Sequence, residues 1–239
     1  MGIASNIEFI DSEINECCLR VGRKRSDVRL MAVSKFHPQS AAEEAFKAGL
    51  TLFGESRVKE ASEKFENFAN GRADIELHMI GTLQRNKAKL AVSVFDCIQS
   101  VDRNDLIIEL NKVCEHLYDA SGSSEVQFLK IMLELNAGEE NKSGYKDIDE
   151  LFFAADTALA CSNIKISGLM TMAPFTDDTK AIRAAFSNLA EAQKQLQRRF
   201  SDCDWSSLSM GMSGDYKIAI EEGSTILRIG EAIFGERNI

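Results

Sequence analysis

Short apolar runs alternate with amphipathic segments along the whole chain. Runs of apolar residues that favour extended backbone predict buried strands, whereas apolar residues spaced three and four positions apart predict helices. The strand-like runs lie at 28–33, 51–53, 75–80, 94–98, 126–135, 164–169, 205–208 and 226–229. The pattern therefore predicts eight strands.

The segments between these runs predict helices. The first covers 6–23, where apolar residues follow helical spacing from Ile10 to Val21. Ser40 is a suitable N-cap for a helix over 41–48, which Gly49 would end. The remaining helices are predicted at 57–68, with Gly71 as the terminating residue, at 87–92, 104–117, 148–157, 179–200 and 215–222, and around Ile233 and Phe234.

Strands that alternate with helices are typical of a parallel α/β protein. Eight such units after one extra N-terminal helix predict a single (β/α)8 barrel of the TIM type, one domain over residues 1–239. A doubly wound open sheet is the main alternative, and it normally has a glycine-rich phosphate loop after its first strand. The first strand here is followed by Ser34-Lys35-Phe36-His37-Pro38, which contains no glycine. The barrel is therefore favoured.

Composition narrows the classes of function. A chain of 239 residues with 44% hydrophobic content can bury a large core. Its net charge of -9 argues against a general nucleic-acid or anionic-membrane surface, and no apolar run approaches the length of a membrane span. The six cysteines have no C-x-x-C spacing and no histidine near a pair. This pattern argues against a metal or disulfide framework and favours a cytoplasmic location.

Lys35 is the first candidate for chemistry, because it follows the first predicted strand. Active sites of TIM barrels gather at the carboxyl ends of the strands. A desolvated lysine has a lowered pKa, and its neutral amine can form a Schiff base with a carbonyl. A solvated surface charge is the alternative for a lysine at a strand end.

Two loops near the C-terminus have the composition of an anion site. Residues 209–214, from Ser209 to Gly214, follow the seventh predicted strand, and Gly230 follows the eighth. These are the positions at which TIM barrels prefer to bind phosphate. Ser213 is placed to cap the helix that begins near Asp215 and to direct its hydroxyl at a phosphate. Ordinary turns and caps are the alternative.

Arg228 lies inside a predicted strand, between Leu227 and Ile229. An arginine that points into a barrel needs an acceptor. An interior carboxylate is one candidate. The pyridine nitrogen of pyridoxal phosphate is the other, since arginine can serve as the partner of that atom.

Several motifs carry a family resemblance. They are Ala32-Val33-Ser34-Lys35, Phe53-Gly54-Glu55, His78-Met79-Ile80-Gly81, Lys142-Ser143-Gly144-Tyr145, Gly168-Leu169-Met170, Ser209-Met210-Gly211-Met212-Ser213 and Arg228-Ile229-Gly230. With these motifs in order over nearly the whole chain, the sequence resembles the pyridoxal-phosphate homeostasis protein family. Members of that family fold like the N-terminal barrel of alanine racemase.

The resemblance implies pyridoxal 5'-phosphate as the cofactor. It implies that Lys35 carries the cofactor as an aldimine, that Arg228 faces its ring nitrogen, and that Ser213 and Gly230 hold its phosphate. The residues expected to contact the cofactor are Lys35, Ser56, His78, Ser209, Ser213, Gly214, Arg228, Ile229 and Gly230. No catalytic residue and no metal ligand is assigned.

Two residues depart from the family pattern. Ser56 stands where the family usually has an asparagine that packs on the cofactor ring, and Glu231 stands where it usually has threonine or serine. We expect Glu231 to turn outward, so that only its N–H serves the phosphate. For His78, a hydrogen-bonded core histidine is the alternative to a cofactor contact. Met170 and Met172 are expected to pack in the top layer of the barrel.

Two functions fit these residues. One is a protein that binds pyridoxal phosphate, buffers it and delivers it to apo-enzymes that need it. The other is a small amino-acid racemase, which needs a second acid/base group opposite the lysine, typically tyrosine. Tyr118, Tyr145 and Tyr216 have no obvious strand-end position, and we expect no second domain of the kind that closes racemase sites. We therefore favour binding and delivery, by a cytoplasmic monomer that binds neither nucleic acid nor membrane.

Overall fold

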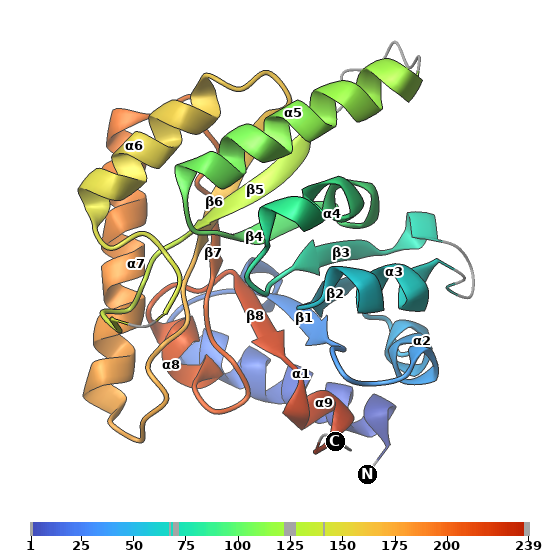
Figure 1. The fold of residues 1–239 in the computed structure, drawn as a ribbon. Helices are drawn as coiled ribbons and strands as arrows, with labels where there is room; N and C mark the ends of the chain where they lie inside the picture. The colour runs from blue at the N-terminus through green and yellow to red at the C-terminus, as the bar shows by residue number, and fades with distance from the viewer. Residues whose placement is uncertain (1, 67, 69–71, 122–127, 141, 237–239) are drawn as a thin grey trace.

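The structure, a computed structural model, describes residues 2–66, 68, 72–121, 128–140 and 142–236. Its strands form a closed barrel in the order β1 to β8, and β8 pairs in parallel with β1. Helices surround the barrel, and helix α1 precedes the first strand (Figure 1). The predicted (β/α)8 barrel with an extra N-terminal helix is confirmed.

The strands are short and are separated by one or more helices. The strands are β1 (Arg29–Val33), β2 (Leu52–Glu55), β3 (Glu76–Met79), β4 (Cys97–Val101), β5 (Leu129–Glu134), β6 (Ile164–Met170), β7 (Ser207–Ser209) and β8 (Ile226–Ile229). The helices are α1 (Ile3–Arg20), α2 (Gln39–Lys47), α3 (Val58–Phe65), α4 (Ala88–Val94), α5 (Asn104–Ser121), α6 (Ile148–Leu159), α7 (Thr179–Arg199), α8 (Tyr216–Glu221) and α9 (Glu231–Phe234), with 3-10 turns at Arg25–Asp27, Arg72–Asp74 and Arg85–Lys87.

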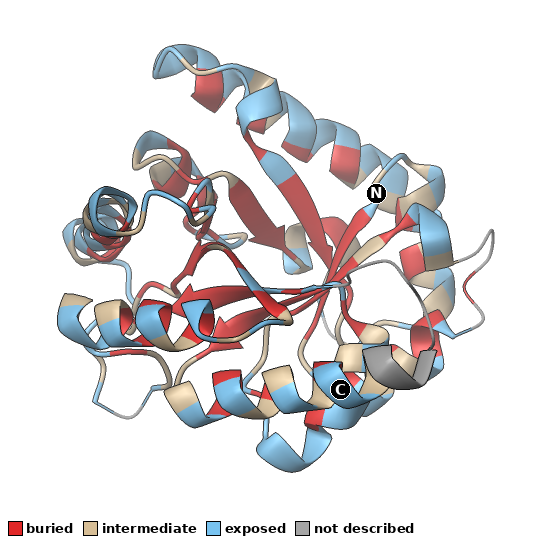
Figure 2. Cartoon of the chain, turned by 90° about the horizontal axis from the view of Figure 1, so that it is seen from above, coloured by how far each residue is buried: buried red, intermediate tan, exposed pale blue. Residues whose placement is uncertain are grey.

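Strand side chains alternate between the barrel interior and the layer under the helices. Seen from above, the strands are mostly buried, with exposed positions near the starts of β1, β5 and β6, whereas the helices are buried mainly on the side that faces the strands (Figure 2). Met170 belongs to a small apolar cluster that is separate from the main core, and Met172 packs against this cluster. The other buried members of the cluster are Met31, Val33, Leu52, Cys97, Met132 and Ile226. The two methionines therefore pack among apolar side chains as expected, in a cluster that also includes the first residues of β2, β4 and β8.

The fourth strand lies three residues later than the sequence pattern predicted. Val94 is the last residue of α4, and the buried Phe95 is the C-cap of that helix. The strand begins at Cys97 and includes Gln99 and Ser100, which are both buried. A search for apolar runs passes over such residues, because their polar groups find partners inside the barrel. Residue patterning alone therefore assigned the last residue of α4 and its C-cap to the strand.

Other predicted boundaries also changed. Pro38, not Ser40, is the N-cap residue of α2, and no side chain caps that helix. The helix predicted over 57–68 ends at Phe65, and Gly71 lies outside the described residues. The first two residues of the strand predicted at 126–135 also lie outside them. No helix in the described part of the chain has both the length and the apolar character that crossing a bilayer requires.

Candidate functional site

The predicted site begins where the first and last strands end side by side. Lys35 is half-buried, two residues beyond β1, and Gly230 directly follows β8. The two strands pair with Ala32 opposite Ile229. A Cβ atom on Gly230 would lie 3.1 Å from the carbonyl oxygen of Val33. Glycine therefore lets the loop after β8 approach the strand that leads to Lys35.

A buried ion pair holds the residue before Lys35. The ammonium of Lys64 donates to the carbonyl oxygen of Ser34 at 2.7 Å and to Glu55 Oε1 at 2.7 Å. The hydroxyl of Ser34 donates to the same carboxylate oxygen at 2.8 Å. Burial raises the pKa of Glu55, and the nearby ammonium opposes that rise. Ser34 is thus fixed through both its side chain and its main chain.

The residue after Lys35 is held by the same helix, α3. The N–H of Phe36 donates to Glu60 Oε1 at 2.6 Å, and this oxygen also accepts from Lys64 at 3.2 Å. Phe36 has a φ of 67°, a left-handed conformation that is uncommon for a large side chain. The guanidinium of Arg57 lies 4.8 Å from the centre of the Phe36 ring. These contacts fix the main chain on both sides of Lys35, and so the position of its Cα atom.

The loops after β7 and β8 contact each other through Ser213. Its hydroxyl oxygen accepts a hydrogen bond from the N–H of Ala232 at 3.3 Å. The prediction that Ser213 caps the following helix is wrong, because α8 begins at Tyr216 with Asp215 as the N-cap residue. Since the oxygen of Ser213 accepts here, its proton remains available for donation to an anion.

Several main-chain donors surround this serine. The N–H groups of Ser213, Gly214 and Glu231 donate no hydrogen bond to the main chain of another described residue. The side chain of Glu231 is exposed, as expected. Asp215 accepts from the N–H of Met212 at 2.5 Å, and burial raises the pKa of its carboxyl group. Small residues and outward N–H groups are the composition of an anion site.

Arg228 lies in the barrel interior with its guanidinium held by oxygen atoms. Nη1 donates to the carbonyl oxygen of Ser209 at 2.6 Å and to its hydroxyl at 2.8 Å, and Nη2 donates to the carbonyl oxygen of Thr171 at 2.7 Å. Burial lowers the pKa of Arg228 to about 10, and the charges of Asp215 and Glu134 oppose this shift. The side chain is therefore a cation at neutral pH, fixed by acceptors other than a salt-bridged carboxylate.

Glu134 is a buried group that the sequence analysis missed. It is the last residue of β5, and its Oε1 accepts from the hydroxyl of Ser143 at 3.0 Å. Burial raises the pKa of Glu134 to about 7, and the charge of Arg228 opposes that rise. An acidic residue at the carboxyl end of a predicted barrel strand was the signal that could have revealed it.

Other predicted contacts have the following surroundings. A Cβ atom on Gly81 would lie 2.5 Å from the carbonyl oxygen of Ser56, so these two backbones are in close contact. Ile229 packs in the main apolar core and pairs with Ala32 in the ladder between β8 and β1. His78 is buried and hydrogen-bonded to Glu76 and Gln99. Among the described residues, no group of His, Cys, Asp and Glu side chains could hold a metal ion.

Known proteins resemble this chain over almost its full length. The family described as "Alanine racemase, N-terminal domain" matches residues 14–238. The pyridoxal phosphate homeostasis protein of Vibrio cholerae serotype O1 is 39% identical over 239 residues, which cover 99% of this chain and 97% of that protein. The corresponding protein of Escherichia coli K12 is 34% identical over 238 residues, with the same coverage.

Solved structures give a consistent result. PipY of Synechococcus elongatus PCC7942 with pyridoxal phosphate (PLP) bound has a TM-score of 0.81 and 32% identity, covering 98% of this chain and 100% of PipY. A histidine racemase from Leuconostoc mesenteroides has a TM-score of 0.68 at 18% identity, and the match covers 99% of this chain and 57% of the racemase. The likeness to the racemase concerns the fold alone. The chain therefore belongs to the pyridoxal phosphate homeostasis protein family, whose barrel is that of the alanine racemase N-terminal domain.

Proposed function

We propose that this protein binds pyridoxal 5'-phosphate and serves its homeostasis by buffering the cofactor and delivering it. The observation that carries the proposal is the juxtaposition of Lys35, the donors around Ser213 and the buried cation Arg228 at one end of the barrel. An amine, an anion site and a fixed cation match the aldehyde, phosphate and pyridine nitrogen of the cofactor. Relatives of 34–39% identity bear the corresponding name.

Each group of the cofactor has a matching residue. The Ser213 hydroxyl and the N–H groups of Gly214 and Gly230 are assigned to the phosphate, and Arg228 to the ring nitrogen. Lys35 is assigned to the aldehyde carbon. When bound, the cofactor supplies a reactive carbonyl and a ring that can withdraw electrons. The close approach of Gly230 to Val33 supports this arrangement, because a Cβ atom there would lie only 3.1 Å from the carbonyl oxygen of Val33.

Carrying, not catalysis, is the role that we propose. Arginine offers only donors, so Arg228 disfavours a proton on the ring nitrogen and weakens electron withdrawal by the ring. Tyr145 is buried, and its hydroxyl donates to Asn104 Oδ1 at 2.9 Å. Burial also raises the pKa of Tyr145 well above its usual range. This tyrosine is therefore poorly suited to act as the second base of a racemase.

One observation keeps the racemase as a second candidate. Glu134 lies at the carboxyl end of β5, and its pKa of about 7 lets it hold or release a proton near neutral pH. A group of this kind could act as an acid/base partner. An assay for racemisation of common amino acids separates the two functions.

We propose that the recipients of the delivered cofactor are apo-enzymes that require pyridoxal phosphate. We also propose that the protein works as a monomer. A cytoplasmic location is supported by the cysteines, which are all unpaired. Cys17, Cys18, Cys97 and Cys114 are moreover buried.

The test is reductive trapping of the cofactor on the protein. Addition of pyridoxal phosphate should turn the purified protein yellow, and borohydride should then fix the cofactor mass on the peptide that contains Lys35. Lys35→Ala should lose the trapped mass and keep the melting temperature of the apo-protein. Lys142→Ala is the matched control, because Lys142 is partly exposed and forms an ion pair with Glu139. Trapping on a different lysine in the wild type would show that the assignment is wrong.

A further inference from the structure

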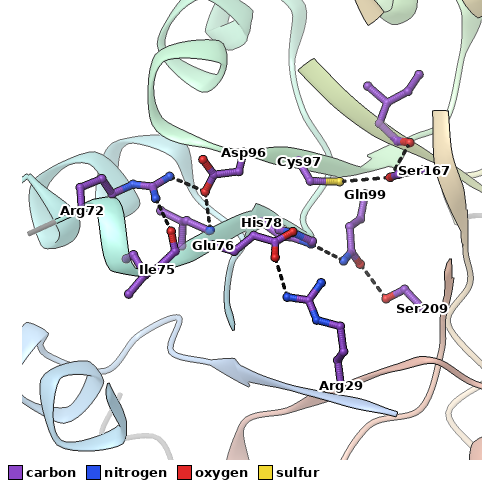
Figure 3. Close-up of polar contacts among 12 residues, drawn as sticks. Arg29, Arg72, Ile75, Glu76, His78, Asp96, Cys97, Gln99, Ser167 and Ser209 are labelled. Carbon is purple, nitrogen blue, oxygen red and sulfur yellow. Dashed lines mark hydrogen bonds and ion pairs between the residues drawn. The ribbon is translucent and has the colours of Figure 1, made fainter. Parts of the chain in front are cut away.

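A series of hydrogen bonds runs through the barrel interior and ends at Arg228. We call this series the interior relay; its members are Arg29, Glu76, His78, Gln99, Ser209 and Arg228. Figure 3 shows it from Arg29 to Ser209. Arg29 and Glu76 are the first residues of β1 and β3, at the end of the barrel opposite Lys35. The relay therefore connects the two ends of the barrel.

The bonds of the relay are short. Arg29 Nη2 lies 2.5 Å from Glu76 Oε2, and His78 Nε2 lies 2.8 Å from Glu76 Oε1. Gln99 Nε2 lies 2.7 Å from His78 Nδ1. The Ser209 hydroxyl lies 2.7 Å from Gln99 Oε1. The contact between Arg29 and Glu76 is shorter than an ordinary hydrogen bond, and the other three distances are typical of well-formed hydrogen bonds.

The direction of donation in the relay follows from its two ends. The pKa of Glu76 lies well below its usual range because His78 and Arg29 donate to it, so this carboxylate only accepts. His78 Nε2 must then carry a proton. Gln99 turns its NH2 group to His78 Nδ1 and its oxygen to Ser209, and an amide NH2 can only donate, so Nδ1 accepts and the imidazole is neutral. The Ser209 hydroxyl donates its proton to Gln99 Oε1, so its oxygen lone pairs can accept from Arg228.

Burial makes this order of donors and acceptors hard to change. Gln99 and Ser209 are completely buried, and His78 and Arg228 are 3% and 4% exposed. Reversing Gln99 would place its oxygen against the acceptor His78 Nδ1 and would remove the acceptor of the Ser209 hydroxyl proton, both at buried positions. Gln99 therefore fixes the orientation of the Ser209 hydroxyl, and the Ser209 oxygen in turn fixes Arg228 Nη1.

We propose that Gln99 and His78 are positioning residues that fix the guanidinium of Arg228 toward the ring nitrogen of the cofactor, with Glu76 holding His78 in its Nε2–H tautomer. This inference rests on the proposed function. In this proposal, neither Gln99 nor His78 contacts the cofactor. Two of the five N–H groups of Arg228 remain for a ligand, since the other three donate to Ser209 and Thr171.

The first arm of the test uses the protein without cofactor. The chain has only three histidines, so the 15N signals of His78 can be assigned with a His78→Gln variant. We expect the neutral Nε2–H tautomer in the wild type, and a shift of the tautomer equilibrium in Glu76→Gln. An imidazolium or an Nδ1–H tautomer in the wild type would overturn the proposed direction of the relay.

The second arm measures cofactor binding by absorbance titration. Gln99→Leu removes both amide bonds in the middle of the relay and should weaken pyridoxal phosphate binding by roughly three- to tenfold. The bound cofactor should also gain a pH-dependent absorbance change, because a loosened Arg228 permits protonation of the ring nitrogen. Ser167→Ala is the matched control. Ser167 belongs to β6, donates to the carbonyl oxygen of Ile131 at 3.1 Å and has no bond to the relay.

The outcomes separate this inference from the function on which it rests. Failure of the wild type to bind pyridoxal phosphate would overturn both. Binding by the wild type, with the same affinity and the same pH profile in Gln99→Leu, would overturn the positioning role alone. Weaker binding without the spectroscopic change would also overturn it, because a merely structural role for Gln99 predicts that result.

Discussion

Arg228 is a cation whose position is set before any ligand binds. Its guanidinium donates to Ser209 and Thr171, so little rotational freedom remains for a cofactor to restrict on binding. A residue fixed in this way lowers the entropic cost of association. The same argument applies to Ser213, whose oxygen is already engaged by the N–H of Ala232.

Ser213→Ala should weaken retention of pyridoxal phosphate. The serine proton is available for the phosphate, and a hydrogen bond to a charged group at this site contributes about 1–2 kcal/mol. Dissociation constants for the two proteins measure the difference. Ser206→Ala is the matched control, because Ser206 is exposed and precedes β7 at the opposite end of the barrel. Equal weakening in both variants would contradict a specific phosphate contact.

Glu134 should make stability depend on pH. Its pKa is about 7 in the folded protein and 4.5 as the ordinary value, so between these values the folded state binds more protons than the unfolded state. The free energy of unfolding therefore falls as pH rises from about 4.5 to about 7, and this loss is complete above pH 7. Glu134→Gln should lack this fall. Urea unfolding of both proteins across the range measures it, and parallel pH curves would contradict the raised pKa.

At the scale of elements, α3 organises the turn that follows β1. Lys64 and Glu60 of this helix bind the main chain of Ser34 and Phe36, the two neighbours of Lys35. The ion pair between Lys64 and Glu55 has side-chain exposures of only 6% and 0%. A helix that follows the second strand thus fixes the geometry of the loop after the first.

Lys64→Met should destabilise the protein by about 3–5 kcal/mol, because it leaves the carboxylate of Glu55 buried without its partner. The double variant Glu55→Gln/Lys64→Met should recover much of this loss. Lys59→Met is the matched control, since Lys59 lies in the same helix and pairs with Glu63 at the surface. Denaturant unfolding measures all three variants. A loss in Lys64→Met no larger than in Lys59→Met would contradict the buried pair.

The sequence pattern located elements better than it located polar partners. It predicted the barrel because apolar runs and helical periodicity depend on local spacing. It displaced β4 because Gln99 and Ser100 are buried polar residues whose partners are distant in sequence: His78 of β3 and Ser209 of β7 for Gln99, and Gly81, just after β3, for Ser100. It did not reveal the pair of Glu55 and Lys64, since a charged residue is usually exposed and only the closed fold brings these two together.

At the scale of the whole molecule, the barrel brings distant segments to one end. Lys35 follows β1 and Arg228 belongs to β8, and the closure of the barrel makes these strands neighbours. A ligand held by both therefore links the two ends of the sequence. The site is selective for the folded state, because the unfolded chain cannot reproduce this juxtaposition. Binding of the cofactor at a hundredfold excess over its dissociation constant thus stabilises the fold by about 2.7 kcal/mol.

The bound cofactor should be a poor catalyst. Arg228 is cationic at neutral pH and can only donate, so in the proposed arrangement the ring nitrogen that it faces should stay unprotonated and the ring should withdraw electrons weakly. Transamination and decarboxylation depend most on that withdrawal and should be negligible. Racemisation depends on it less, but it needs a second base, and Tyr145 is committed to Asn104. We therefore expect turnover with common amino acids far below the usual range of about 1–1000 per second.

Assays of the wild type, Arg228→Glu and Glu134→Gln decide how far this argument holds. Glutamate beside the ring nitrogen can share a proton with it, so Arg228→Glu should raise side reactivity if the variant retains the cofactor. Retention is checked by absorbance before each assay. If the wild type racemises an amino acid at an ordinary enzymatic rate and Glu134→Gln does not, the carrier proposal is wrong. The protein would then be an enzyme that uses Glu134 as its second base. Slow reaction in the wild type, with no dependence on Glu134, is the result that a carrier predicts, because its site holds the cofactor by the same contacts that keep its ring unreactive.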